Sequence, residues 1–323
     1  IMKILFIHTF QIKTKMKSYL KKIFTVLKII FSLPLYLFWF PILLIIRIIK
    51  PIYLIRFSII RSSRIGHFAG ICSQYLSEKE MNICQPKNSF QDFFIFAQDI
   101  SNDQIAKLYR SKINILPRFI FLPLVRLNYF LPGGLVHEAI FNQKDKLQRT
   151  TCFNHRDIHN LLDKTKPHVC FTSQEIKDGN IQLKKIGINE NDKIIAIHVR
   201  EANFRYHFDD KLQTYSYLDT RNTNIYNFIP SIKKLISLGY KVVRYGKGKS
   251  QKINFSDINY IDLTTHSLRS DFLEIYLVFK STFCIGSDSG GSYFPIWLFR
   301  KPTIIANYVP IGDMHTYSKN ILT

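Results

Sequence analysis

Polar side chains follow several short apolar runs in the last third of the chain. The string HVRE ends the run IIAI, and the string SDSGG follows the run FCIG. In open parallel sheets, ligands bind at the carboxyl ends of the strands. The candidates for a ligand site are therefore His198, Arg200, Glu201, Arg244, Gly246, Asp262, Ser287, Ser289, Gly290, Gly291 and Asn307.

The spacing of His198 and Arg200 suits the binding of a phosphorylated ligand. The two residues alternate at the end of an apolar strand, so their side chains are expected on the same side. An arginine guanidinium stays charged and donates two hydrogen bonds to a diphosphate. The alternative is a structural histidine beside an inter-strand salt bridge. For Arg244, a surface ion pair is as well supported as a ligand contact. Gly246 beside it allows a ligand to approach the backbone.

The string GSDSGG at residues 286–291 is followed by an apolar helical pattern. Small hydroxyl residues and glycines at a helix N-terminus present backbone N–H groups that bind phosphate or a sugar hydroxyl. The alternative is a plain tight loop. An esterase-type nucleophile elbow is excluded because Asp288 stands at the position of the nucleophile. A P-loop is excluded because its lysine and glycine spacing are absent.

Strands alternate with helices around these residues, which predicts an α/β fold with a doubly wound parallel sheet. Apolar spacing predicts one helix near residues 225–236 that ends at Gly239, and a second that begins at Ser270–Asp271. The expected strands are Ile194–His198, Lys241–Arg244, Tyr260–Leu263, Phe283–Gly286 and Thr303–Ala306.

The first half of the chain carries weaker patterns. Tyr53–Ile60 and Phe93–Ala97 are expected strands, and a turn with Gly66 and Gly70 is expected after the first. Residues 98–112 suit a helix, whereas residues 113–134 hold too many prolines for a plain one. Residues 143–191 suggest two helical stretches with a linker near 178–180. These patterns divide the chain into a membrane-associated segment (1–50), an N-terminal Rossmann-like acceptor domain (51–180) and a C-terminal donor-binding domain (181–323).

Residues 29–46 contain no charged side chain, and basic residues flank them on both sides. The length is at the lower limit for a spanning helix, and Pro34 and Pro41 would each remove a backbone hydrogen bond. We favour a segment that lies in the cytoplasmic leaflet of the inner membrane with its cations on anionic head groups. A single spanning helix and a buried core segment are the alternatives.

The net charge of the chain is +22 over 323 residues, which favours an anionic partner. A nucleotide diphosphate, an anionic membrane surface and nucleic acid all fit this charge. The five cysteines are widely spread and none has the spacing of a metal site, so neither a structural zinc nor a metal cofactor is expected.

Several strings in this order resemble a family of uncharacterised bacterial glycosyltransferases. They are RSSRIGHFA, HVRE, YSYLDTRNTNIYNF, LGYKVVRYG and CIGSDSGG, and they extend from about residue 52 to the C-terminus. The HxR at residues 198–200 is more distantly similar to the donor motif of fucosyltransferases. Glu201 and Ala202 follow it here, where that pattern often has a second arginine and an aspartate, and this leaves the donor open.

The resemblance implies a GT-B-like pair of Rossmann-like domains that face each other across a cleft. Arg200 would hold the donor pyrophosphate beside His198, and Ser289, Gly290 and Gly291 would contact phosphate or sugar. Arg64, Gly66 and His67 would face the cleft from the acceptor side. The implied reaction moves a sugar from a nucleotide-sugar donor to a hydroxyl acceptor, in surface glycan or lipid-linked saccharide synthesis.

The general base of such a reaction is either His67 or Glu201. No DxD metal-binding motif is evident in the sequence, and the related pair Asp209–Asp210 lies in a polar stretch that is expected to face solvent. Arg200, Arg244 and backbone N–H groups would therefore stabilise the leaving diphosphate in place of a metal ion. Two alternatives remain. The aromatic and basic stretch Phe204–Arg221 could bind nucleic acid, or the chain could be a non-catalytic membrane-associated fragment, since Thr323 closely follows the last expected strand.

Overall fold

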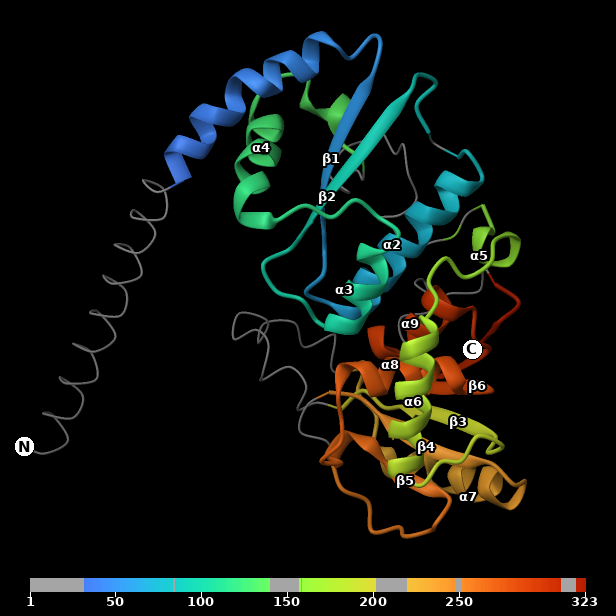
Figure 1. The fold of residues 1–323 in the computed structure, drawn as a ribbon. Coiled ribbons are helices and arrows are strands. Elements are labelled where there is room, and N and C mark those ends of the chain that lie inside the picture. Colours follow the sequence, from blue (N-terminus) through green and yellow to red (C-terminus); the bar gives the residue numbers. More distant parts are fainter. Residues whose placement is uncertain are drawn as a thin grey trace, which may run out of the picture.

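The computed structural model describes residues 32–83, 85–139, 157, 159–201, 220–247, 251–308 and 318–323. Its strands form two parallel sheets, one in each half of the chain (Figure 1). The N-terminal sheet pairs β1 (Leu54–Ile60) with β2 (Phe90–Phe96). A buried ion pair between Arg56 of β1 and Asp92 of β2, 2.6 Å apart, fixes the register of the two strands.

The C-terminal sheet has six parallel strands in the order β5-β4-β3-β6-β7-β8. Strand order therefore runs outwards in both directions from the pair β3 and β6, which makes this pair the topological switch point of a doubly wound sheet. The branched apolar residues of β3 and β4, such as Ile195, Val242 and Val243, are almost fully buried. The strands are β3 (Ile194–His198), β4 (Lys241–Tyr245), β5 (Tyr260–Asp262), β6 (Phe283–Ser287), β7 (Thr303–Ala306) and β8 (Ile321–Leu322).

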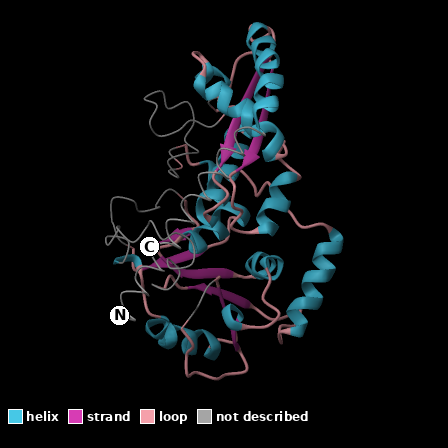
Figure 2. Cartoon of the chain, turned by 90° about the vertical axis from the view of Figure 1, so that its left-hand side faces the viewer, coloured by secondary structure: helices cyan, strands magenta, loops and turns pink. Residues whose placement is uncertain are grey.

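Helices cover both faces of this sheet (Figure 2). One face packs against the short helix η5 (Ile225–Phe228) and α7 (Ile229–Ser237), with Pro230 in the first turn of α7. The other face packs against α8 (Asp271–Lys280) and α9 (Gly290–Phe299). The Ser270 hydroxyl caps α8 by accepting the Leu273 N–H, as the sequence predicts. Helix α6 (Ser173–Lys185) packs on α8, so the expected boundary near residue 180 falls inside a helix of this layer.

The N-terminal sheet is covered by α2 (Ile65–Glu80), α3 (Asp103–Arg110) and α4 (Arg118–Phe130). Residues 32–48 form a further helix beside α4 (Figure 1). The short helices η1 (Gly134–His137), α5 (Leu161–Lys164) and η6 (Leu263–Thr265) complete the described elements. Helix α2 packs along α9 and so joins the two halves of the molecule. The Ser73 hydroxyl of α2 donates to the Trp297 carbonyl oxygen of α9 at 2.6 Å.

Three local predictions are wrong. Gly66 and Gly70 lie inside α2 and form no turn. Residues 118–130 are a helix despite Pro123, because Leu124 and Val125 pack against the sheet and offset the hydrogen bond that proline removes. The linker expected near residues 178–180 is helical, because Gly179 lets α6 approach the ring of Tyr276. Strand β8 was not expected from the sequence. In the part of the chain that is described, no helix has the length and apolar character needed to cross a bilayer.

Candidate functional site

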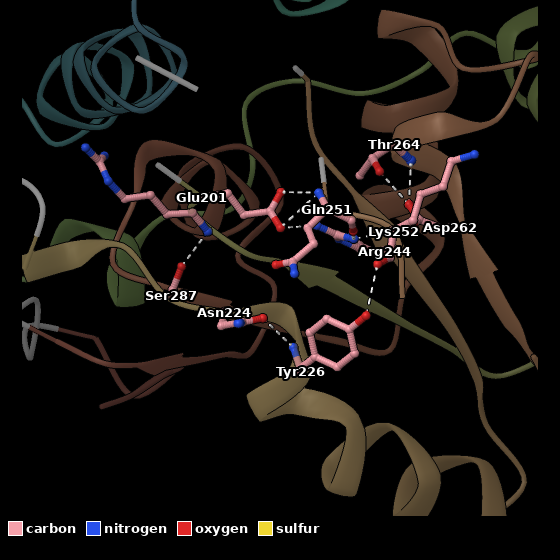
Figure 3. Close-up of polar contacts among 10 residues, drawn as sticks. Glu201, Asn224, Tyr226, Arg244, Gln251, Lys252, Asp262, Thr264 and Ser287 are labelled. Carbon is pink, nitrogen blue, oxygen red and sulfur yellow. Dashed lines mark hydrogen bonds and ion pairs between the residues drawn. The ribbon is translucent and has the colours of Figure 1, made fainter. Parts of the chain in front are cut away.

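The switch point brings together two of the predicted groups of polar residues. His198 ends β3 and Ser287 ends the neighbouring strand β6. The Ser287 hydroxyl accepts a hydrogen bond from the Arg200 backbone N–H at 2.7 Å (Figure 3). The strings HVRE and GSDSGG are therefore in direct contact, with the N-terminus of α9 beginning at Gly290.

The His198 imidazole is enclosed by glycines and hydroxyl groups. The Ser289 hydroxyl lies 3.0 Å from Nδ1 of the ring, and the Ser292 hydroxyl lies 3.4 Å from it. A Cβ on Gly291 would collide with the imidazole, and one on Gly246 would lie 3.4 Å from Cδ2 of the same ring. Burial, and after it the nearby Arg244 and Arg200 cations, lower the pKa of His198 to about 3. The ring is therefore neutral near pH 7 and can act as a hydrogen-bonding group, not as a cation.

The residues Arg221 and Asn222 belong to the same group, although they were not among the predicted site residues. The Arg221 guanidinium makes a two-pronged ion pair with the carboxylate of Asp288, at 2.5 and 2.8 Å. Asn222 accepts a hydrogen bond from Nε of Arg200 at 3.2 Å, and Asn307 donates to the Asn222 carbonyl oxygen at 3.3 Å. Both residues lie in the string YSYLDTRNTNIYNF, which contributes to the family resemblance. An arginine followed by an amide side chain is the feature of the sequence that could have marked them as site residues.

The N-terminal half contributes the start of α2 to this group. A Cβ on Gly66 would lie 2.5 Å from the Cα of Gly290, so the first turns of α2 and α9 touch backbone to backbone. The segment that follows β1 is therefore held against the segment that follows β6. Neither helix has a side-chain cap or an acidic residue in its first turn. Two helix N-termini, each with partial positive charge, converge at this point.

Cationic side chains surround the convergence point. Burial, and after it the cations of Arg64, Arg61 and Arg221, lower the pKa of His67 to about 4. Arginines from both halves of the chain therefore lie close enough to His67 to act on it electrostatically. Arg221 is paired with Asp288. The two helix ends each carry partial positive charge, and an anion is the ligand that such a site favours.

Arg244, Glu201 and Asp262 form a separate buried cluster (Figure 3). The Arg244 side chain is 1% exposed, and its nitrogens lie 2.8 Å from Glu201, 3.1 Å from Asp262 and 2.6 Å from the carbonyl oxygen of Gln251. The Glu201 carboxylate also accepts the Gln251 N–H. Arg244 is therefore in an ion pair, as the alternative proposed, but the pair is buried and not on the surface. The Glu201 carboxylate is bound to this cation. The cluster fixes the segment that follows Arg200.

Some predicted features fall outside the described residues. These are Asp209–Asp210, Ala202 and all of Phe204–Arg221 except Thr220 and Arg221. Within the described ranges, no three His, Cys, Asp or Glu side chains lie close enough together to hold a metal ion.

Neither a protein-family model nor a curated protein matches the sequence. Solved structures with a similar arrangement include the ADP-heptose lipopolysaccharide heptosyltransferase II of E. coli, with 11% identity, a TM-score of 0.46 and coverage of 83% of this chain and 89% of that one. A family 9 glycosyltransferase of Veillonella parvula shows 10% identity, a TM-score of 0.45 and coverage of 77% and 79%. The E. coli heptosyltransferase WaaC shows 13% identity, a TM-score of 0.42 and coverage of 83% and 92%. A likeness of this size does not assign the chain to a family.

Proposed function

We propose that the chain is a glycosyltransferase that takes its sugar from a nucleotide-diphosphate donor. One observation supports this most directly. The N-termini of α2 and α9, from the two halves of the chain, meet at Gly66 and Gly290 beside the switch point of a doubly wound sheet. Helix N-termini and switch points are places where phosphorylated ligands bind.

We call the place where the first turns of α2 and α9 meet the junction. The donor diphosphate would lie across it. Arg200 comes from the C-terminal half, and Arg61 and Arg64 come from the N-terminal half. Arg221 is already paired with Asp288 and would act at longer range. Fixed cations and helix N-termini stabilise a transition state most strongly where negative charge develops in it. In this reaction that charge develops on the leaving nucleoside diphosphate. Protein side chains supply the charge stabilisation in this scheme. Neutral His198 and the hydroxyls of Ser289 and Ser292 would orient the donor by hydrogen bonds.

We assign the general base to His67, which lies in the first turn of α2 beside Gly66. In the transfer, the acceptor oxygen attacks the anomeric carbon, and the bond from that carbon to the phosphate oxygen breaks. The nucleoside diphosphate leaves with the electron pair, and the acceptor proton passes to His67. The pKa of His67 is low because it is buried among cations. A bound diphosphate would offset those cations and raise this pKa towards the range that a general base needs. Glu201 is a weaker candidate because Arg244 already holds its carboxylate.

The reaction itself tests this proposal. Purified protein is incubated with nucleotide sugars, with and without hydroxyl acceptors that include lipid-linked saccharides, and release of nucleoside diphosphate is followed. We expect one donor to turn over, and His67→Gln to reduce turnover by about 10²- to 10⁴-fold while the donor still binds. His266→Gln is the matched control, because His266 is partly exposed and directly follows η6 rather than either helix start at the junction. Full turnover in His67→Gln would remove His67 from the mechanism, and no turnover of any donor would count against the transferase.

A further inference from the structure

Large apolar side chains are exposed together on two neighbouring helices of the N-terminal half. The helix of residues 32–48 and α4 lie side by side (Figure 1). Nε1 of Trp39 donates to the Ile120 carbonyl oxygen at 2.8 Å, and Arg47 donates to the Pro132 carbonyl oxygen at 2.6 Å. The first helix thus buries one side against α4, where Leu43 is fully buried and Ile46 is 7% exposed.

The rest of that helix is equally apolar but faces solvent. We call the exposed apolar side chains of the two helices the N-terminal apolar surface. Its most exposed side chains, at 58% to 85%, are Leu37, Phe38, Ile45, Ile48, Phe119 and Phe130. Single exposed apolar residues are ordinary on protein surfaces, whereas a gathered set marks an interaction site.

The charges on these segments are of one sign. Residues 32–60 and 111–137 contain no Asp or Glu. Lys50 and Arg126 are exposed among them. Arg118 and Arg126 are both on α4, and Arg118 donates to the Phe96 carbonyl oxygen at 2.8 Å.

An apolar face edged by cations has two possible kinds of occupant. A second copy of the chain would bring these cations against their own counterparts, because a two-fold interface joins identical patches. An anionic bilayer would instead accept the apolar side chains at the head-group level and pair the cations with lipid phosphates and carboxylates. The charge pattern therefore favours the bilayer.

We propose that the N-terminal apolar surface docks the protein onto an anionic membrane, with the helix of residues 32–48 lying in the plane of the interface. Docking of this kind is independent of the nucleotide site, which lies beyond the carboxyl end of β1, where the start of α2 contacts α9. The docked orientation would suit an acceptor that is itself embedded in the bilayer.

Vesicle co-sedimentation of the full chain, without nucleotide, tests the docking. We expect tight binding to vesicles of phosphatidylcholine with phosphatidylserine and weak binding to phosphatidylcholine alone. The double change Lys50→Gln with Arg126→Gln should weaken binding about fivefold for each cation removed. The triple change Phe38→Ser, Ile45→Ser and Ile48→Ser should weaken it by more than about tenfold, since each position contributes apolar contact area.

Ile258→Ser is the matched control, because Ile258 is 86% exposed and lies far along the chain from both helices. It should bind vesicles as the parent does, and circular dichroism should show that all variants are folded. Vesicle binding that is unchanged in the triple variant would overturn the proposal. The proposal would also be overturned if the parent protein did not bind vesicles and was a dimer in size-exclusion chromatography, whereas the triple variant was a monomer. Either result leaves donor turnover, and hence the proposed transfer reaction, as a separate question.

Discussion

At the scale of single residues, two histidines of the site are neutral for the same reason. Burial is the main cause of the low pKa of both His67 and His198, and arginine cations lower the pKa of both further. The folded values are about 4 and about 3, against about 6.5 in the unfolded chain. Between these values the unfolded chain binds more protons than the folded one.

The free energy of unfolding should therefore depend on pH in the acid range. Above pH 6.5 both histidines are neutral in the folded and the unfolded chain, and the free energy of unfolding is not reduced by their protonation. Below pH 6.5 it falls progressively, down to about pH 4 for His67 and about pH 3 for His198. The expected slope is on the order of 1.4 kcal/mol per pH unit for each histidine in this window. Urea denaturation at a series of pH values measures it. His67→Gln should reduce the slope by more than the control His266→Gln does; a slope that His67→Gln does not alter would contradict the assigned burial.

Single residues also show how much of the site the sequence could predict. Strand ends are readable from apolar runs, so His198, Arg200 and Ser289 could be proposed as neighbours from the sequence alone. The partner of an arginine is a question of tertiary distance. Nothing local to Arg244 shows that Glu201 and Asp262 lie within 3.1 Å of its guanidinium. Arg221 was missed for the same reason, because its partner Asp288 is distant in the sequence.

At the scale of elements, the contact between α2 and α9 depends on glycine at both helix starts. In an exposed helix, Gly→Ala stabilises by about 1 kcal/mol. At Gly66 the added Cβ would lie 2.5 Å from Gly290 Cα, and at Gly290 it would lie 2.7 Å from Gly66 N. Both neighbours are backbone atoms, so the helices themselves would have to move apart.

We therefore expect the opposite sign for these two changes. Gly66→Ala and Gly290→Ala should each destabilise by about 1–3 kcal/mol and weaken nucleotide binding, because they separate the two helix N-termini. Thermal unfolding and a nucleotide titration measure the two effects. Ser63→Ala is a suitable control, since Ser63 is exposed two residues before α2. Stabilisation by Gly66→Ala would show that the helix starts are not in close contact.

Strands were easier to predict from the sequence than helices and turns. The bounds of β3 and β7 match their predictions, because a buried parallel strand is a short uninterrupted apolar run. Helix α4 was missed because proline opposes helix formation locally, whereas Leu124 and Val125 favour it through contacts with β1 and β2. Gly66 looked like a turn residue because a close helix contact and a turn both select glycine.

At the scale of the whole molecule, the two halves meet where their sheets present the carboxyl ends of β1, β3 and β6. The net charge of +22 adds a long-range attraction for anions, which weakens with salt. The sequence could predict this charge and the doubly wound sheet. The family resemblance placed Gly66 and Gly290 on opposite sides of a cleft, but their direct backbone contact could not be predicted, because it joins residues more than two hundred positions apart.

The central claim is that this junction binds a nucleoside diphosphate. A thermal-shift titration with ADP, GDP, UDP and CDP tests it most directly. Ligand at a hundredfold excess over its Kd should stabilise the protein by about 2.7 kcal/mol. We expect one nucleotide to raise the Tm, Arg200→Ala to abolish the shift, and Arg126→Ala, which removes an exposed arginine on α4, to retain it. No shift with any of the four, or an equal shift in Arg200→Ala, would contradict the account.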